Sequence, residues 1–299
     1  MTTSKRVEMK RVIYLILGIL IVALYYYGES TSEANNTRNG AEVNIEQSNA
    51  EAGNPPSPLL PASREDQSEQ ILERTAYTVC YNKETRQPNW VAWTITKGNV
   101  TESNMIVDRP VNAPFHEDEE TPSPRATLDD YRGSGWTRGH MCPAGDCRWR
   151  EDVQYESFLL SNVSPQSRAL NAGVWNDIEK SCRRWALRYG KVYVVSGPIF
   201  FKKSEKGYIG RNKVKVPDAF FKVILCTDSK EPKGIGFVCR NENGAATVSN
   251  SGDAHKRTKK EIYIHSIDEV ERITGYDFFP ALPDDVEEKV EATANYEEW

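Results

Sequence analysis

The sequence lacks a net positive charge and has few histidines, and each shortage narrows the range of functions. Its 38 Lys and Arg residues are outnumbered by 43 Asp and Glu residues, which gives a net charge of -5 at pH 7. Because a basic surface is the usual sign of a nucleic-acid partner, any such partner has to be attracted locally. The four histidines are too scattered to form a zinc-finger pattern, which argues against structural zinc.

Positive charge is instead concentrated in the middle of the chain. From Tyr131 to Lys191, ten Lys and Arg residues face six Asp and Glu residues, so this stretch carries +4 and the remainder carries -9. The 299 residues, 38% of them apolar, are enough for one large domain or two small ones with a buried core. The composition is that of an ordinary globular protein with one locally basic segment.

The first thirty residues have the pattern of a membrane-targeting segment. Basic residues at positions 5, 6, 10 and 11 precede a charge-free apolar run from Val12 to about Gly28. The run is at the short end of what crosses a bilayer, and the tyrosines at 25–27 suit a membrane interface. Since no convincing cleavage site follows, we expect an uncleaved anchor, with a buried core helix as the alternative. The positive-inside rule then predicts an exported protein, anchored in the inner membrane and facing the periplasm, or secreted.

A change of composition precedes the folded domain. Residues 29–70 are rich in Ser, Asn, Glu, Pro and Ala and poor in aromatic residues, which predicts a disordered linker. The predicted organisation is a membrane anchor or signal segment at 1–28, a disordered linker at 29–70 and a single domain at 71–299.

The domain has the pattern of an α+β fold. Five β-rich runs are predicted as strands, the first two as a hairpin, at 75–81, 90–96, 192–200, 220–226 and 234–240. Helical spacing is clearest at 173–189 and 267–273, and residues 112–130 are expected to form a loop. The six cysteines permit disulfides, with Cys226 and Cys239 facing each other across a hairpin as one option and free buried thiols as the other.

Three motifs between Gly133 and Arg184 carry a family resemblance. They read GSGWTRGHMCPAGD, FLLSNVSPQ and LNAGVWNDIEKSCRR. Together they resemble the DNA/RNA non-specific endonuclease family, which includes secreted bacterial nucleases and mitochondrial endonuclease G. The resemblance extends from about Tyr77 to the TGYDFFPALPDDVE segment. It implies a central, mainly antiparallel sheet flanked by helices, with a ββα-metal finger as the active site.

The resemblance places a general base at His140, within the family's Arg-Gly-His core of Arg138, Gly139 and His140. Hydrolysis of a phosphodiester requires a water to lose its proton as it attacks phosphorus, and an imidazole titrates close enough to neutrality to accept that proton. An isolated histidine is more often structural, and the other three histidines keep that interpretation.

The family's metal ligand falls on Asn171, whose amide oxygen suits a hard ion such as Mg²⁺, or another divalent cation such as Mn²⁺. The family's metal-associated acid falls on Glu179. If residues 171–179 form one helix, eight rises of about 1.5 Å separate the two Cα atoms by roughly 12 Å. We therefore expect Glu179 to hold metal-bound water rather than to ligate the metal beside Asn171.

Three further positions match family sites, and a fourth departs from them. Arg183 corresponds to a phosphate-contacting arginine, with an intrahelical salt bridge to Glu179 as the alternative, and Arg109 is a looser match to an upstream arginine. Asn162 matches an active-site position, where it would orient His140 or simply form a turn. Thr137 departs from the family, which usually has Asp there, so a carboxylate that braces the strand is replaced by a hydroxyl.

The resemblance implies a metal-dependent enzyme that cleaves DNA and RNA with low sequence specificity, since phosphate-directed arginines carry no base information. Two alternatives remain. One is a catalytically weakened protein that binds nucleic acid at the cell surface, which Thr137 and the acidic balance would suit. The other is a phosphodiesterase acting on small nucleotides, against which the local charge of +4 argues.

Overall fold

The computed structural model describes residues 59–101, 104–108, 115–229, 231–242 and 263–299. The predicted membrane-targeting segment, Arg109 and His255 lie outside these residues. Across the part of the chain that is described, no helix combines the length and apolarity needed to cross a membrane.

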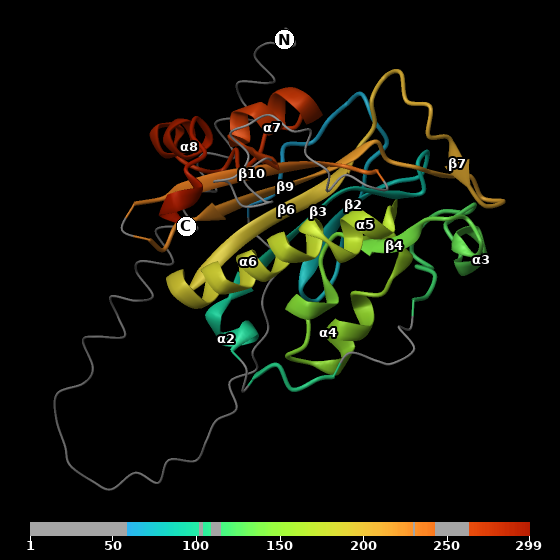
Figure 1. Cartoon of the computed structure of the whole chain (residues 1–299), viewed down its shortest axis with the longest axis horizontal. Helices are drawn as coiled ribbons and strands as arrows, with labels where there is room; N and C mark the ends of the chain where they lie inside the picture. Colours follow the sequence, from blue (N-terminus) through green and yellow to red (C-terminus); the bar gives the residue numbers. More distant parts are fainter. Residues whose placement is uncertain (1–58, 102–103, 109–114, 230, 243–262) are drawn as a thin grey trace, which may run out of the picture. The chain divides into compact units, whose positions relative to one another are not determined.

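A seven-stranded sheet forms the centre of the described domain, in the order β1-β2-β3-β6-β9-β10-β11 (Figure 1). Every neighbouring pair is antiparallel. The strands are β1 (Gln70–Glu73), β2 (Tyr77–Asn82), β3 (Gln87–Thr96), β6 (Lys191–Ile199), β9 (Ala219–Cys226), β10 (Lys233–Arg240) and β11 (Ile264–His265). The five predicted strands are confirmed to within a few residues, and the predicted antiparallel α+β fold with them.

Both faces of this sheet are covered by helices. Along β3, Val91 and Trp93 join the core cluster under helix α6 (Val174–Tyr189), while Trp90 and Ala92 join the cluster under α7 (Ile267–Thr274) and α8 (Asp284–Glu291). Because successive side chains of a strand point to opposite faces, α6 lies on one face and α7 and α8 on the other (Figure 1). This explains why the central strands are apolar almost throughout.

A second, two-stranded sheet and a short helix form the ββα unit. Strand β4 (Thr137–His140) pairs antiparallel with β5 (Val163–Gln166), and α5 (Arg168–Ala172) follows directly, its N-terminus capped by the Ser167 hydroxyl. The remaining elements are α2 (Lys97–Val100), α3 (Leu128–Tyr131), α4 (Glu151–Glu156), β7 (Tyr208–Ile209), β8 (Val214–Lys215) and short 3-10 turns at Ala144–Asp146, Leu160–Asn162 and Tyr296–Glu298.

The structure corrects the predicted start of the domain and the assumption of one continuous helix over residues 171–179. The domain extends back to at least Leu59, since Leu60 packs against the core under α7 and α8 and the Ala62 N–H donates to the Asp277 carbonyl at 2.9 Å. The helix predicted from residue 173 is separated from α5 by Gly173, where a Cβ atom would lie 2.4 Å from the Ala169 carbonyl oxygen. Residues 171–179 are thus two helices, and the predicted separation of about 12 Å, which assumed one continuous helix, does not apply.

The suggested pairing of Cys226 with Cys239 is also wrong. In the β9–β10 register Cys226 lies opposite Lys233 and Cys239 opposite Phe220. All six cysteines are buried free thiols. The alternative of unpaired thiols therefore describes this structure.

Candidate active site

The glycine of the Arg-Gly-His motif lies on β4 beneath a side chain of β5. The Gln166 side chain lies across this glycine, and a Cβ atom at position 139 would be 2.3 Å from Gln166 Oε1. Glycine is therefore the residue that this crossing requires in the Arg-Gly-His motif. The register pairs His140 with Val163 and Thr137 with Gln166, which places the predicted base at the end of a short, well-defined ladder.

His140 is held between aromatic rings. It is 9% exposed, and its ring centroid lies 5.0 Å from that of Phe115 and 5.2 Å from that of Phe158. The Arg138 guanidinium lies over the ring of Phe115, with its Cζ 4.4 Å from the ring centroid. These contacts restrict the orientation of the imidazole and bring Arg138 and His140 to the same aromatic residue.

Asn162 supports the chain just after His140. Its side chain is fully buried, its Oδ1 accepts from the Cys142 N–H at 2.9 Å, and its Nδ2 donates to the carbonyls of Cys142 and Ser157, each at 2.8 Å. Its own carbonyl accepts from the Met141 N–H at 2.9 Å. Asn162 thus fixes the backbone that follows the predicted base, and any effect on His140 passes through that backbone.

Asn171 is joined to strand β4 through Thr137. The Asn171 Nδ2 donates to Thr137 Oγ1 at 3.0 Å, and the same hydroxyl donates to the Gln166 carbonyl at 2.7 Å. With its amino end directed to Thr137, the amide of Asn171 turns its Oδ1 the other way. Thr137 therefore braces both the strand and the side chain of the predicted metal ligand, at the position where the family usually has Asp.

Arg183 forms an ion pair with Asp146, which lies outside its own helix. The Arg183 Nη1 lies 2.6 Å from Asp146 Oδ1, and the Trp93 Nε1 donates to the other carboxylate oxygen at 3.0 Å. Burial lowers the pKa of Arg183, but the Asp146 carboxylate outweighs this and leaves the pKa raised, with the charge of Glu179 acting in the same direction. The guanidinium stays charged and ties α6 to the turn that follows His140.

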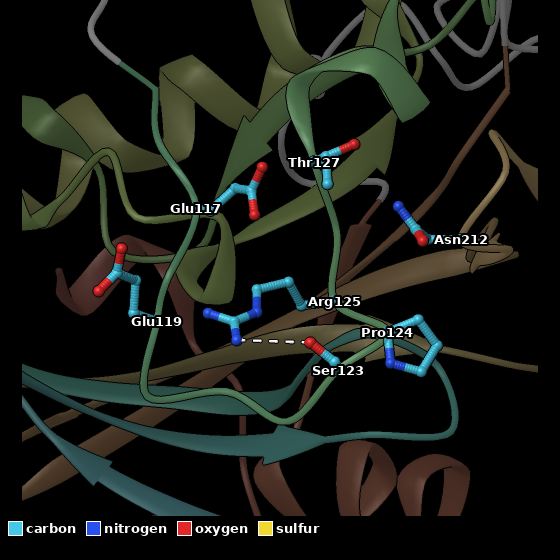
Figure 2. A pocket seen from close by; sticks show the side chains of 7 residues that line it. All are labelled: Glu117, Glu119, Ser123, Pro124, Arg125, Thr127 and Asn212. Atoms are coloured by element: carbon cyan, nitrogen blue, oxygen red, sulfur yellow. Dashed lines mark hydrogen bonds between the residues drawn. The ribbon is translucent and has the colours of Figure 1, made fainter.

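A surface pocket lies elsewhere, along the segment that precedes the ββα unit (Figure 2). Its lining consists of Glu117, Glu119, Ser123, Pro124, Arg125, Thr127 and Asn212. None of these is a predicted site residue, and two carboxylates against one guanidinium disfavour a phosphate. The predicted site residues lie instead on the ββα unit and on α6: Arg138 and His140 on β4, Asn162 just before β5, Asn171 on α5, and Glu179 and Arg183 on α6.

Comparison with known proteins decides the family. The family described as DNA/RNA non-specific endonuclease matches residues 59–285. The chain belongs to this family. It is accordingly a nuclease, with a ββα-metal finger formed by β4, β5 and α5.

The similarity to individual members of the family covers most of the domain. The chain is 34% identical to mitochondrial endonuclease G of Bos taurus over 223 residues, and this alignment covers 71% of this chain and 70% of that protein. It is 35% identical over 222 residues to mitochondrial nuclease EXOG of Xenopus laevis, spanning 70% of this chain and 58% of that relative. The solved EndoG/EndoGI complex matches with a TM-score of 0.63 and 30% identity, over 72% of this chain and 87% of that chain.

The residues at the finger suit the divalent metal on which the family depends. Asn171 offers the oxygen of a side-chain amide whose nitrogen donates to Thr137. Glu179 adds a partly exposed carboxylate in the next helix. Oxygen ligands of this kind are those that hard divalent cations prefer. Three side chains at this site were missed by sequence reasoning: Phe115 lay in a segment expected to form a loop, and Phe158 and Asp146 stood inside the quoted motifs FLLSNVSPQ and GSGWTRGHMCPAGD without a role.

Proposed function

We propose that the domain hydrolyses phosphodiester bonds of DNA and RNA with little sequence specificity, with His140 as general base and Asn171 holding a hydrated divalent cation. The observation that supports this most directly is the hydrogen bond from Asn171 to Thr137, on the strand that carries His140. Three residues of extended strand span about 10 Å, so the Cα atom of His140 lies no further than that from Thr137. The amide and the imidazole thus have a common support.

His140 accepts a proton from the attacking water in this proposal. Its ring is held between Phe115 and Phe158, so little reorientation is needed when the substrate arrives. When bound, a divalent cation at Asn171 supplies charge stabilisation for the transferred phosphoryl oxygens. We propose Mg²⁺ in preference to Mn²⁺, because one amide oxygen with few further protein ligands suits an ion that keeps most of its waters.

The other site residues take supporting roles. Arg138, half-buried against Phe115, would contact a phosphate of the bound strand, and Glu179 would orient the hydration shell of the cation. Arg183 contributes positive charge while its pairing with Asp146 holds α6 against the turn after His140. Asn162 is a positioning residue for the backbone at Met141 and Cys142.

The substrate class follows from where the charge lies. The segment from Tyr131 to Lys191 carries +4 within an acidic chain, which attracts a polyanion to the ββα unit. The described contacts include no recognition helix, and arginines directed at phosphates read no bases. Both DNA and RNA are therefore proposed as substrates.

The test is cleavage by the full-length chain of supercoiled plasmid and of a long RNA, in Mg²⁺ and in EDTA. We expect both polymers to be cut in Mg²⁺ and neither in EDTA. His140→Ala should slow cleavage by about 10²- to 10⁴-fold, as expected for loss of a general base, while nucleic-acid binding is retained. His116→Ala is the matched control, since His116 stacks on Tyr155 at 4.1 Å and is given no catalytic role.

The competing functions predict other results. A weakened surface binding protein would retain both polymers without cutting them at any metal concentration. A small-nucleotide phosphodiesterase would hydrolyse dinucleotides readily and leave plasmid intact. Cleavage unaffected by EDTA would reject the metal role, and a His140→Ala variant of normal rate would reassign the base.

Targeting by the N-terminus is a separate proposal. Residues 12–28 form a charge-free apolar run behind basic residues, and we propose that it directs the nuclease across or into a membrane as an anchor, with residues 29–58 as a linker to the domain. The relatives of Bos taurus and Xenopus laevis are named as mitochondrial, so fractionation has to separate mitochondria from the secretory route and the cell envelope. Recovery of the full-length chain from the cytosol, with no membrane fraction, would reject the targeting role.

A further inference from the structure

Helices α7 and α8 lie close to the sheet on the face away from α6. Two glycines of β10 allow this approach: a Cβ atom at Gly234 would lie 2.4 Å from the Val290 carbonyl oxygen of α8, and one at Gly236 would lie 2.6 Å from the Val270 side chain of α7. The two helices are therefore held side by side over β10 by close packing (Figure 1).

Three carboxylates meet between these helices. Asp268 and Glu271 of α7 and Glu291 of α8 each place one oxygen so that the three oxygens lie within 4.8 Å of one another. Asp268 and Glu271 share a helix face because they are three residues apart. Glu271 is further fixed by the Phe278 N–H, which donates to its Oε1 at 2.6 Å.

The burial of Glu291 is what distinguishes this cluster from an exposed acidic surface. Glu291 is 6% exposed, and its Oε1 is inaccessible to solvent with no hydrogen-bond partner among the described residues. Leaving a buried carboxylate without a donor is costly, and such groups are normally paired or coordinate a metal. The oxygen therefore calls for a ligand that supplies positive charge.

The charged groups around Glu291 do not supply a positive charge to its carboxylate. Burial, followed by the charges of Glu271, Glu287, Asp268 and Asp277, raises the pKa of Glu291 to about 9. Burial also raises the pKa of Glu271 and of Glu287 to about 7. These four neighbouring groups are all acidic, so protons compete with a cation to neutralise the cluster.

We propose that Asp268, Glu271 and Glu291 bind a divalent cation of the Ca²⁺ type that links α7 to α8. Ca²⁺ takes six to eight oxygen ligands at about 2.3–2.6 Å in flexible geometry, so three carboxylate oxygens within 4.8 Å of one another can share one such ion. Mg²⁺ demands near-ideal octahedral geometry at about 2.0–2.1 Å and keeps several of its waters, so a cluster of three protein carboxylates suits it less well. Water and the neighbouring acids would complete the coordination.

This site is distinct from the nuclease centre. It lies on the opposite face of the sheet from α6, and Glu287 and Glu291 fall beyond the residues 59–285 that match the family. The cation would act on stability by joining two helices, since a ligand that binds only the folded state raises its stability with concentration.

The experiment uses the full-length chain, freed of metals by a chelator and then dialysed. Ca²⁺ is titrated by calorimetry in two buffers of different ionisation enthalpy, and the thermal midpoint is followed with Ca²⁺ or Mg²⁺. We expect Ca²⁺ to bind with release of protons and to raise the midpoint progressively, with a smaller rise for Mg²⁺. Asn171→Ala should keep the Ca²⁺ response, which separates this site from the nuclease centre.

Glu291→Gln, which keeps the shape of the side chain, should abolish the Ca²⁺-induced rise and raise the midpoint measured in chelator. Glu288→Gln, on the exposed side of the same helix, is the matched control and should respond as the parent does. Glu271→Gln gives a second test if Glu291→Gln fails to fold. An unchanged midpoint of the parent chain in Ca²⁺, a Ca²⁺ response that persists in Glu291→Gln or Glu271→Gln, or a response lost in Asn171→Ala would each overturn the proposal. An equal response to Mg²⁺ would overturn the preference for Ca²⁺.

Discussion

Thr137 shows how a single hydroxyl can replace part of what a carboxylate does. Its oxygen accepts from Asn171 and donates to the Gln166 carbonyl, so one side chain holds both the amide that is proposed to bind metal and the partner strand. A hydroxyl has one proton to donate and lone pairs to accept, which suits these two contacts. What it does not supply is the negative charge of the Asp usual in the family.

Removing this hydroxyl should weaken metal binding without unfolding the domain. In Thr137→Val the Asn171 amide loses its support and samples more orientations, so we expect the Mg²⁺ concentration for half-maximal cleavage to rise several-fold, with a smaller change in the maximal rate. Thr137→Ser is the conservative control and should restore the Mg²⁺ requirement. A valine variant with an unaltered Mg²⁺ requirement would show that Thr137 does not position Asn171.

At this scale the sequence proposes the chemistry but does not predict its supports. His140 and Asn171 were singled out because they stand in motifs whose residue types have a known chemical purpose. Phe115 and Asp146 were not, because their roles depend on contacts made across long stretches of chain: Phe115 reaches His140, and Asp146 reaches Arg183 and Trp93. Neither contact leaves a local pattern in the sequence.

Among the elements, α7 and α8 give the clearest pH dependence. Burial raises the pKa of Glu291 from 4.5 to about 9, and the pKa values of Glu271 and Glu287 to about 7. The acids facing Glu291 are Asp268 and Glu271 on α7, Asp277 on the segment that follows it, and Glu287 on α8. The raised pKa values mean that Glu291, Glu271 and Glu287 favour the protonated form in the folded state.

The consequence is a loss of stability as the pH rises. Because the folded chain binds more protons than the unfolded chain, the contribution of Glu291 to the free energy of unfolding is intact below about pH 4.5 and declines through about pH 9. Urea unfolding in chelator, compared between pH 5 and pH 8, should show a steeper decline for the parent chain than for Glu291→Gln. Parallel declines would mean that Glu291 does not titrate in this way.

The regular elements were predictable where a single physical rule governs them. The five strands were predictable because short apolar runs rich in β-branched and aromatic residues, bounded by turn residues, form strands that are buried on both faces of a sheet. The break between α5 and α6 was missed because it depends on the backbone of Gly173, which is not helical at φ -104° and ψ -120° and lies too close to the Ala169 carbonyl for a side chain. The pairing of Cys226 with Cys239 failed because register depends on the whole β9–β10 hairpin.

For the molecule as a whole, the acidic balance and the polyanionic substrate are reconciled by where the charges lie. Residues 263–299 contain eleven Asp and Glu against two Lys and Arg, a net charge of -9, whereas residues 131–191 carry +4. The acidic part includes α7 and α8, which cover the face of the sheet opposite α6. The net charge of the chain therefore says little about the surface that meets the substrate.

This separation predicts cleavage that depends on salt. With two phosphates contacted by basic side chains, kcat/KM on duplex DNA should fall roughly tenfold between 50 and 200 mM salt at constant Mg²⁺. A small phosphodiester with a single charge should show little change, which controls for direct effects of salt on the enzyme. Equal salt dependence for both substrates would contradict local electrostatic attraction.

The central claim is that the imidazole of His140 and the amide of Asn171 serve the same cation-bound phosphate. The direct measurement is the nuclear magnetic resonance spectrum of the full-length chain with labelled histidines, recorded as paramagnetic Mn²⁺ is added. We predict strong broadening of the His140 signals in the parent chain, and loss of that broadening in Asn171→Ala. Sharp His140 signals at Mn²⁺ concentrations that support full cleavage would contradict the account.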